Sequence, residues 1–290
     1  MKRNFRFNDF GILILVFVLS RVLMIALGIR MNMQPLLAYW QYLDVETLRH
    51  NLFRGVWYDH AQPPAFNLFL GIMLKISGNQ SVLFFAVVFK FISLFNGLLL
   101  TSIVRKISPL RFLPLIVALA YLLSPATLIY ECELFYTSFI SLLLLVSVYF
   151  LIRLKTKSTW SNMAGFFLPL VLVCLTRSVY HIAWLAVVIF ALLFCFRGKA
   201  ASRKMLPVGF LSLMLVGSWY VKNKMVFDKL SASSWLGMNL ARNVFHDNEI
   251  TDSNNIAAYA PFSPVSTYKK FIDPAYEKRF NGLNDRDLLQ

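Results

Sequence analysis

Long runs of apolar residues recur along most of this 290-residue chain, and they restrict its fold more than any other feature. The first run covers residues 10–29, which is long enough to cross a bilayer as a helix of about 20 residues. Further runs cover residues 63–76, 82–104, 112–129, 134–152, 163–175, 179–196 and 206–220. Inside hydrocarbon, a segment of this kind satisfies its backbone groups as a helix. The sequence therefore predicts an all-α integral membrane protein, a polytopic bundle of about seven or eight apolar helices.

The composition favours a membrane protein and argues against a nucleic-acid partner. Hydrophobic residues make up 58% of the chain and charged residues 15%, whereas soluble domains are about 25% charged. The formal net charge of +15 would suit a nucleic-acid binder, but the basic residues cluster at the ends of apolar runs. Membrane topology explains that placement better. We therefore expect membrane lipid, and no nucleic acid, among the partners.

Basic residues set the expected orientation of the chain. The basic first residues, MKRNFRFND, place the N-terminus in the cytoplasm and the loop of residues 30–62 on the outer face. Three later basic clusters mark cytoplasmic loops: Arg105/Lys106/Arg111, Arg153/Lys155/Lys157 and Arg197/Lys199/Arg203/Lys204. Two apolar runs separate the outer loop from Arg105, and two crossings would return the chain to the outer side. Either residues 63–76 do not cross fully, or one basic cluster is misassigned.

The segment of residues 42–71 gathers polar side chains between two apolar runs. Four apolar residues within it are spaced three or four positions apart and share one helix face: Val45, Leu48, Leu52 and Val56. Residues 39–57 are therefore expected to form an amphipathic juxtamembrane helix that lies on the membrane. Such a helix can present Asp44 at the interface, although a loop aspartate can also be a solvated surface residue.

Two consecutive prolines, Pro63 and Pro64, end this outer loop and open the next apolar run, because proline is tolerated in the first turn of a helix. Asp59, His60 and Gln62 precede them, and His60 and Gln62 are thereby held at the mouth of that span. Substrate binding is one interpretation of His60 and Gln62. A capping or interface position is the alternative for His60.

Other outer-face segments carry groups of opposite charge. Glu131 and Glu133 lie just before the run that begins at residue 134, and the turn LTRSVYH carries Arg177. Further polar residues lie beyond the last span: Lys222, Asn223, Gly237, Asn239 and Arg242. Helix-start stabilisation would explain one of the two glutamates. Interfacial snorkelling would explain the basic side chains.

Arg21 lies near the middle of the first span. A charge at that depth costs about 2.5–3.5 kcal/mol on insertion scales. We therefore expect its side chain to face protein, water or an anionic group rather than lipid. Inside a bundle, its partner would be a backbone carbonyl or a carboxylate.

Carboxylates and cations on one side of the membrane suit a reaction in which an acceptor is deprotonated and an anionic leaving group is held. A carboxylate takes the proton, while Arg or Lys pairs with a phosphate through charge-assisted hydrogen bonds. Sugar transfer from a lipid-linked phosphate donor needs these parts. The acidic residues of the segments described above show no DxD or His-rich spacing, and phosphate-cradling glycine loops are missing. No metal or other cofactor is therefore expected.

Several motifs, taken in their order along the chain, resemble those of the polytopic GT-C glycosyltransferases. They are Arg21 in the first span, the acidic outer helix, H-A-Q-P-P at residues 60–64, and Ser124-Pro125 followed by Glu131. The chain is most similar to the branch that holds the lipid A aminoarabinose transferases and protein O-mannosyltransferases. LTRSVYH resembles that branch's Leu-Thr-Arg/Lys turn, and WYVKNKMVFDKLSASSWLGMNL resembles its Trp-x-x-[Arg/Lys]-Asn segment leading to Gly-x-Asn-Leu. The resemblance covers roughly residues 10–245, and the H-x-Q-P-P and W-x-x-K-N pair is its most specific part.

The resemblance implies an inverting transfer from a polyprenyl-phosphate sugar donor to a lipid, glycan or protein acceptor on the outer, periplasmic or luminal side. It also implies a multi-pass protein of the bacterial inner (plasma) membrane. Carried over by position, Asp44 is the implied base that activates the acceptor, and Glu131 is the second outer-face carboxylate. Arg177 and Lys222 are the implied contacts of the lipid phosphate. The remaining substrate-binding residues are His60, Gln62, Glu133 and Asn223.

The chain departs from the family pattern in two ways. The usual Asp-Glu pair, counted back from Gly55, falls near Trp40 and Gln41, where no acid stands. Many relatives are longer, so the chain is expected to be a truncated product or a fragment. Within it, residues 1–222 are expected to form the transmembrane module and residues 223–290 a polar outer-face segment.

Two other functions stay open. A lipid or polysaccharide transporter would use Arg21 and a charged cavity, but it should carry polar residues along several spans or discontinuous helices at the midplane. Apart from Arg21, Lys90 and a few small polar residues, the spans are apolar and charge concentrates at one face, which favours surface chemistry. The third interpretation is a non-catalytic remnant or assembly subunit, which the short length supports.

Overall fold

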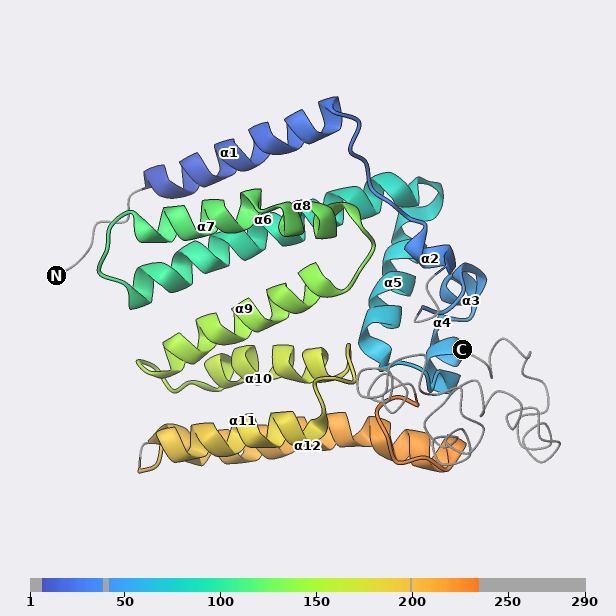
Figure 1. Ribbon diagram of the computed structural model, residues 1–290. Coiled ribbons are helices and arrows are strands. Elements are labelled where there is room, and N and C mark those ends of the chain that lie inside the picture. The colour runs from blue at the N-terminus through green and yellow to red at the C-terminus, as the bar shows by residue number, and fades with distance from the viewer. Residues whose placement is uncertain (1–6, 39–41, 199, 235–290) are drawn as a thin grey trace, which may run out of the picture. The chain divides into compact units, whose positions relative to one another are not determined.

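The computed structural model describes residues 7–38, 42–198 and 200–234, and its regular structure is helical (Figure 1). In chain order the helices are α1 (Phe7–Ala26), α2 (Pro35–Ala38), α3 (Val45–His50), α4 (Leu52–Tyr58), α5 (Pro64–Ser77), α6 (Ser81–Ile107), α7 (Leu113–Leu123), α8 (Pro125–Cys132), α9 (Thr137–Leu154), α10 (Trp160–Cys174), α11 (Ile182–Cys195) and α12 (Ala200–Phe227). A 3₁₀ turn, η1 (Gly78–Gln80), joins α5 to α6. The longer helices coincide with the apolar runs, so the predicted all-α fold is confirmed for the described residues.

Four helical stretches of the described chain are long and apolar enough to cross a membrane: Asp9–Ala26, Pro64–Ile107, Thr137–Leu154 and Ser202–Phe227. A fifth is obtained if α7 and α8, which meet at a bend of 52°, form one broken span. These helices are compatible with an integral, multi-pass membrane protein. The predicted number of seven or eight spans is not confirmed. The reason is that α5, α10 and α11 have only 14, 15 and 14 residues, fewer than the about 20 that a crossing needs.

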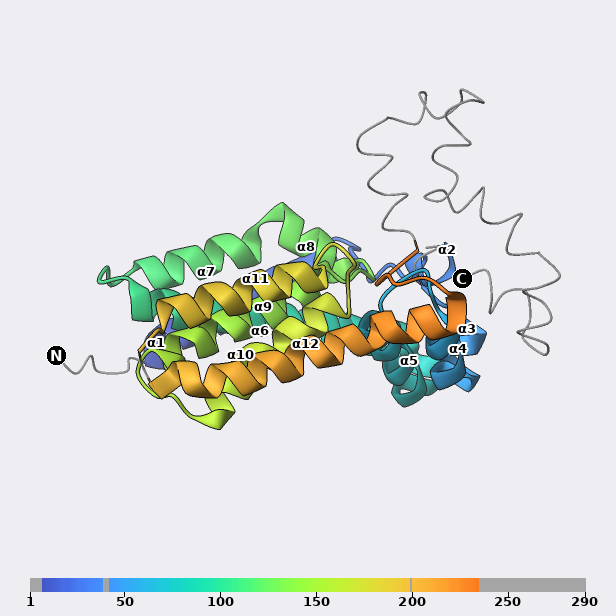
Figure 2. The same ribbon diagram turned by 90° about the horizontal axis from the view of Figure 1, so that it is seen from below.

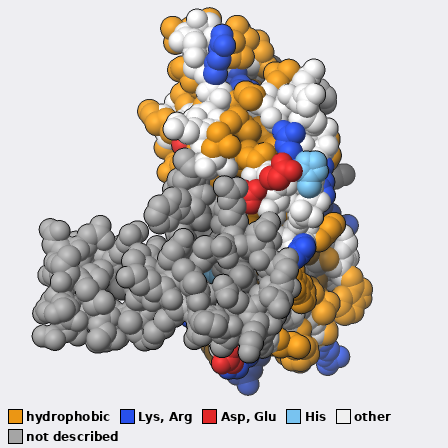
Figure 3. Space-filling model, turned by 90° about the vertical axis from the view of Figure 1, so that its right-hand side faces the viewer, with side chains coloured by type: hydrophobic (Ala, Val, Ile, Leu, Met, Phe, Trp, Pro, Cys, Tyr) orange, Lys and Arg blue, Asp and Glu red, His pale blue; other side chains and the backbone are white. Residues whose placement is uncertain are grey.

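The surfaces of these helices fit a lipid environment. Five hydrophobic side chains of α1 are each more than half exposed: Leu15, Leu19, Val22, Leu23 and Ile25. Hydrophobic side chains are also spread over the described part of the face shown in Figure 3. Soluble monomers rarely expose contiguous apolar patches larger than a few hundred Å². Lipid therefore explains these surfaces better than water does.

The described residues form two compact units, each assembled from separate stretches of chain. Unit 1 contains residues 7–38, 73–173, 188–198 and 200–212, and unit 2 contains residues 42–72, 174–187 and 213–234. α12 contributes to both as one unbroken helix (Figure 2). The boundary expected between residues 222 and 223 thus falls inside a helix. Residues 235–290, with Gly237, Asn239 and Arg242, lie outside the described residues.

Basic residues of unit 1 gather at one end of its helices. Arg105, near the end of α6, forms an ion pair of 2.7 Å with Asp9, near the start of α1. The Lys106 ammonium lies 4.3 Å from the ring centre of Tyr149 in α9, and Lys204 donates a 2.9 Å hydrogen bond to the loop that follows α9. The three basic clusters therefore share one end of the unit, as their common assignment to one side of the membrane implies.

Arg21 has its partner within the same unit. Its Nη2 lies 2.5 Å from Glu131 Oε2, and its Nε donates to both carboxylate oxygens at 3.1 Å. The guanidinium carbon is also 4.2 Å from the ring centre of Phe17. Both charged side chains are buried, Glu131 with 0% exposure. Of the partners expected for Arg21, the carboxylate is therefore confirmed.

Glu131 lies near the end of α8, so stabilisation of a helix start does not explain it. α8 begins after a break in the chain, where Ser124 Oγ accepts a 3.2 Å hydrogen bond from the backbone N–H of Thr127. Pro125 takes the first helical position and has no N–H to continue the hydrogen bonding of α7. The bend between α7 and α8 therefore follows from the Ser-Pro step.

The predicted juxtamembrane helix is two short helices in the structure, α3 and α4, which meet at Asn51. The aliphatic face that periodicity identified packs inward, because Leu48 and Leu52 are buried within unit 2. Phe53 and Trp57, four residues apart on α4, are exposed instead. Aromatic side chains favour the membrane interface. This aromatic pair, rather than the aliphatic stripe, is thus the surface that α4 offers to lipid.

Removing one partner of the Arg21–Glu131 pair should destabilise the protein strongly. Glu131→Leu leaves a buried guanidinium without its carboxylate, which costs about 3–5 kcal/mol. The double variant Arg21→Met/Glu131→Leu should recover most of that loss. Asp9→Asn, which breaks a partly exposed pair, should cost less than about 1 kcal/mol. The free energy of unfolding in detergent measures all three, and equal losses in the single and double variants would contradict the pairing.

Candidate functional site

The candidate site in unit 2 is built around the turn between α4 and α5. The Asp59 carboxyl is 2% exposed, and donors surround it. Oδ1 accepts hydrogen bonds from the backbone N–H groups of Ala61 at 2.8 Å and Gln62 at 3.3 Å, and Oδ2 accepts from Asn67 Nδ2 at 2.9 Å. Aspartate commonly folds a turn in this way, by accepting from N–H groups two and three residues on. The Asp59 side chain therefore fixes the turn that leads to Pro64.

Asn67 links this turn to the start of α3. While its amide nitrogen donates to Asp59, its Oδ1 accepts a 3.1 Å hydrogen bond from the backbone N–H of Leu43. The next residue, Asp44, is half-buried and caps α3 by accepting from Thr47 N at 2.9 Å and Thr47 Oγ1 at 2.7 Å. One asparagine thus holds both aspartate-bearing segments in a fixed arrangement.

Lys222, near the end of α12, reaches the same turn. Its Nζ donates a 2.9 Å hydrogen bond to the Asp59 carbonyl and lies 3.5 Å from the ring centre of Trp219. Trp219 and Lys222 are three residues apart and therefore share a helix face. The buried ammonium is held between a carbonyl oxygen and an indole ring, both of which attract a cation.

Residues 231–234, here called the strap, run back to this turn after α12 ends. Asp228 has φ 58°, the left-handed conformation that often terminates a helix. Two hydrogen bonds from α12 hold the strap: Trp219 Nε1 donates to the Ala232 carbonyl at 3.1 Å, and Asn223 Nδ2 donates to the Ser231 carbonyl at 2.8 Å. Two more run from the strap to the turn. Ser234 N donates to the His60 carbonyl at 2.9 Å, and Ser233 Oγ donates to the Ala61 carbonyl. The strap therefore joins α12 to the turn before α5.

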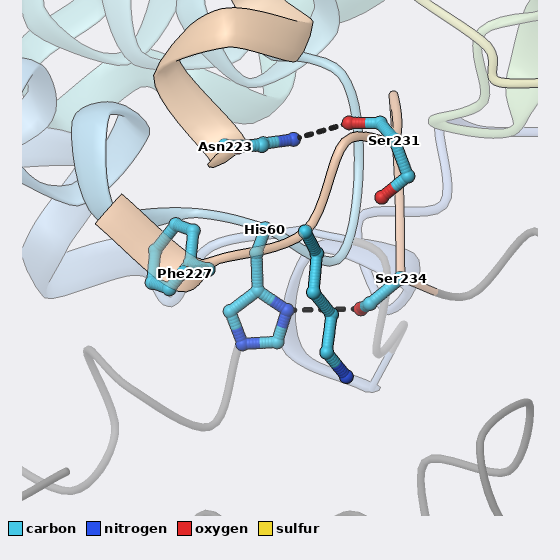
Figure 4. Close-up of a pocket in the computed structure, with 6 residues that line it drawn as sticks. His60, Asn223, Phe227, Ser231 and Ser234 are labelled. Atoms are coloured by element: carbon cyan, nitrogen blue, oxygen red, sulfur yellow. Dashed lines mark hydrogen bonds between the residues drawn. The ribbon is translucent and has the colours of Figure 1, made fainter. Parts of the chain in front are cut away.

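A small pocket, with space of about 10 Å³ for a water-sized group, lies beside the strap (Figure 4). Its lining residues are His60, Asn223, Phe227, Lys229, Ser231 and Ser234. Figure 4 shows the His60 ring directed at Ser234, with 2.9 Å between Nδ1 and Oγ. The same ring meets Phe227 edge-on, with 4.9 Å between ring centres. Asn223 Oδ1 is buried and has no hydrogen-bond partner among the described residues.

Burial raises the pKa of the Asp59 carboxyl from 3.8 to about 7, because loss of hydration disfavours its charged form. The backbone N–H groups of Gln62 and Ala61, the Lys222 ammonium and the Asn67 amide lower the pKa, but desolvation outweighs them. The turn therefore contains an acid that exchanges its proton near neutral pH.

Several predicted site residues come together in unit 2. Lys222 bonds to the turn, His60 and Asn223 line the pocket, and Gln62 is buried with its N–H on Asp59. Lys222 of W-x-x-K-N bonds to Asp59, 163 positions away, which is the residue directly before H-x-Q-P-P. As substrate-binding groups, these four residues stay predictions.

The other predicted residues are distributed differently. Asp44 lies in unit 2 at the start of α3. Arg177 also lies in unit 2, half-buried in a turn. A 2.7 Å backbone hydrogen bond connects this turn to the start of α5. Glu131 and Glu133 lie in unit 1, where Glu131 pairs with Arg21. Glu133 forms a backbone bridge with the segment after α1. As catalytic or substrate-binding groups, these four residues stay predictions.

Three residues that shape the site were given no role by the sequence: Asp59, Asn67 and Ser234. An aspartate that closely precedes a Pro-Pro step is typical of a turn-forming side chain, and this spacing would have indicated Asp59. Asn67 stands in an apolar helix and Ser234 in a polar segment. No local pattern distinguishes them, because their partners are distant in sequence.

Among the described residues, no group of three or more His, Cys, Asp or Glu side chains is placed to hold a metal ion. Comparison of the chain with family models, with curated proteins and with solved structures found no match. Its function is therefore inferred from the side chains of the site.

The raised pKa of Asp59 predicts a pH-dependent stability. The carboxyl titrates near 3.8 in the unfolded chain and near 7 in the folded protein, so the folded state binds more protons between these values. The contribution of protonated Asp59 should be complete below about pH 4 and lost as pH rises to about 7, by at most about 4 kcal/mol. Unfolding free energies measured from pH 4 to 8 should show this slope in wild type and in Asp44→Asn, but not in Asp59→Asn. A slope that persists in Asp59→Asn would assign the titration to another group.

Proposed function

We propose that the protein is a membrane glycosyltransferase that moves a sugar from a polyprenyl-phosphate donor to an acceptor on the outer or periplasmic side. The hydrogen bond between Lys222 and the Asp59 carbonyl carries this proposal, because it joins W-x-x-K-N to the residue that directly precedes H-x-Q-P-P. Both motifs resemble those of the GT-C glycosyltransferases. Two resemblances that are distant in sequence gain weight when they meet in space. The apolar helices also suit a donor whose lipid tail stays in the bilayer.

In the proposed reaction, an acceptor oxygen forms a bond to the anomeric carbon of the sugar while the bond from that carbon to the phosphate oxygen breaks. The electron pair of the broken bond leaves with the polyprenyl phosphate, and the acceptor's proton passes to a carboxylate. Attack from the side opposite the phosphate inverts the configuration. The reaction therefore needs an approachable base and a cation for the leaving phosphate.

Asp44 is assigned as the base. It is half-buried rather than enclosed, and its hydrogen bonds to Thr47 hold it at a fixed position. Asp59 is surrounded by three donors, so it and Asn67 are assigned to positioning the Asp44 segment. Glu131 is left out of the chemistry because its carboxylate is paired with Arg21 inside unit 1.

Arg177 is assigned to the leaving phosphate. It is half-buried in the turn that is hydrogen-bonded to the start of α5. Lys222, expected from the resemblance to contact the same phosphate, is 5% exposed and bonded to the Asp59 carbonyl. Its assigned part is to keep His60 and Gln62 at the mouth of α5.

The proposal includes seven crossings with a cytoplasmic N-terminus. The Asp9–Arg105 pair puts the start of α1 and the end of α6 at the same end of unit 1, so an even number of crossings separates them. α1 and α6 supply two, so α5 is assigned to the outer interface rather than to a crossing. α10 and α11 are assigned as short spans, which a bilayer accommodates by local thinning. The broken span α7–α8, then α9, α10, α11 and α12, alternate after α6. All three basic loops then lie in the cytoplasm.

Thiol labelling tests this topology in protein whose native cysteines are replaced. Asn79→Cys, in η1 between α5 and α6, should react with a membrane-impermeant maleimide added to intact cells. Ser108→Cys, after α6, should react only once the membrane is permeabilised. The reverse pattern, or labelling of both from outside, would refute an interfacial α5.

The transfer reaction is tested by Asp44→Asn. Asparagine caps helices about as well as aspartate, so the variant should keep α3 and lose only the base. We expect kcat to fall by about 10²–10⁴-fold, the usual contribution of a general base. Reconstituted protein would be assayed for release of polyprenyl phosphate from polyprenyl-phosphate mannose or glucose.

The matched control is Glu46→Gln, which removes an exposed carboxylate two residues further along and should leave kcat unchanged. Wild-type kcat in Asp44→Asn would remove Asp44 from the mechanism. No transfer by the wild-type protein from either donor would count against the function itself.

A further inference from the structure

One end of unit 1 carries a large excess of positive charge. The end of α6, the end of α9 and the start of α12 lie on this side of the unit (Figure 1). Of the three described carboxylates of unit 1, Asp9 is the one at this end, and it is paired with Arg105. The described basic residues there are Arg105, Lys106, Arg111, Arg153, Lys155, Lys157, Arg197, Arg203 and Lys204. This end therefore suits an anionic partner.

Exposed apolar side chains lie among these cations. Three of them, between the end of α6 and the start of α7, are each more than 60% exposed: Ile107, Leu110 and Phe112. Trp160, at the start of α10, is also exposed, and its ring centre lies 5.8 Å from the Lys204 ammonium. Aromatic and basic side chains occur together at membrane interfaces, with rings near the hydrocarbon and charges near the phosphates. A lipid surface therefore fits this end better than a soluble polyanion, which would leave the apolar side chains in water.

Two of the cations share one aromatic ring. The Lys106 ammonium lies 4.3 Å from the ring centre of Tyr149, and the Arg153 guanidinium carbon lies 5.9 Å from the same centre. Both side chains are exposed, and neither forms an ion pair with a described carboxylate. Two like charges so close repel each other, and an anion that contacts both offsets the repulsion. α6 and α9 thus bring together two groups that bind phosphate well.

The surface of α6 continues from Lys106 as an apolar stripe. Four residues at intervals of three or four positions share its helix face: Ser102, Leu99, Phe95 and Phe91. The two phenylalanines are 51% and 66% exposed. A phospholipid has the same order of groups, with a phosphate at the interface and acyl chains that run towards the midplane. A lipid whose phosphate contacts Lys106 would therefore lay a chain along this stripe.

We propose that this end of unit 1 binds a phospholipid of net negative charge. Lys106 and Arg153 hold its phosphate, and an acyl chain lies along the stripe of α6. A zwitterionic phospholipid brings its own cation into a region that already has an excess of them, whereas phosphatidylglycerol brings none. The site lies within unit 1, so its assignment does not depend on the reaction proposed for unit 2.

Native mass spectrometry of the full-length protein, released from detergent micelles, tests the site. The protein is titrated with phosphatidylglycerol and with phosphatidylcholine of the same acyl chains. A basic residue near an anionic lipid surface strengthens binding by about fivefold. The first phosphatidylglycerol should therefore bind with a Kd at least about tenfold lower than that of phosphatidylcholine.

Variants with equal changes of charge separate this site from the general charge of the end. Lys106→Gln/Arg153→Gln should weaken binding of phosphatidylglycerol by about ten- to thirtyfold and that of phosphatidylcholine by less than about threefold. The matched control, Lys155→Gln/Lys157→Gln, removes two exposed cations from the loop after α9 and should cost less than about threefold for either lipid. Lys106→Arg/Arg153→Lys keeps both charges and should bind like wild type.

The proposal is wrong if the two lipids bind equally, or if the control variant loses as much affinity as Lys106→Gln/Arg153→Gln. It is also wrong if a short oligothymidylate binds wild type as tightly as phosphatidylglycerol, since the partner would then be a soluble polyanion. Should the double variant fail to fold, the single substitutions Lys106→Gln and Arg153→Gln decide, each with an expected loss of about fivefold. Wild-type affinity in both would refute the site.

Discussion

The hydrogen bond from the Lys222 ammonium to the Asp59 carbonyl determines where the turn before α5 lies. The side chain of the same aspartate bonds to the next N–H groups of the turn, so a shift at this residue moves Ala61 and Gln62 with it. The position of the strap depends on the turn too, since Ser234 N and Ser233 Oγ donate hydrogen bonds to the carbonyls of His60 and Ala61. Without the ammonium, the Asp59 carbonyl would lose its partner in a buried position, at a cost of about 1–3 kcal/mol. The walls of the pocket would lose their common support.

The buried carboxylates of Glu131 and Asp59 are stabilised in different ways. Glu131 receives charge-assisted hydrogen bonds from a guanidinium, which places two opposite charges in contact. Asp59 receives only neutral donors, and its nearest described cation, Lys222, bonds to its carbonyl instead of its carboxylate. Neutral donors offset less of the desolvation cost than a paired charge does, which is why burial raises the pKa of Asp59 to about 7. The ion pair thus fixes unit 1, while the turn of unit 2 keeps a group that exchanges protons near neutral pH.

Apolar runs predicted the helices because only a helix satisfies its own backbone in hydrocarbon. The cost of burying a polar group predicts that the group has a partner, but not which residue that partner is. The cost of burying Arg21 predicted a partner, but the choice of Glu131, 110 positions away, arises from the fold. Periodicity identified the aliphatic stripe of α3 and α4, but not that Leu48 and Leu52 face protein rather than lipid. Motif order likewise brought Lys222 into the site, whereas its bond to a backbone carbonyl has no counterpart in any residue pattern.

The buried charges of unit 1 bear on the transporter alternative. A transporter needs discontinuous helices and polar groups that a substrate can reach, and the bend between α7 and α8 supplies the first. The second is not met by Arg21 and Glu131, which are 3% and 0% exposed. A substrate would have to separate this pair before touching either charge, at about 3–5 kcal/mol in every cycle. Asp44, the proposed base in unit 2, carries no such cost, because its side chain is only half-buried. The proposed chemistry at the turn of unit 2 therefore avoids a cost that passage through unit 1 would carry.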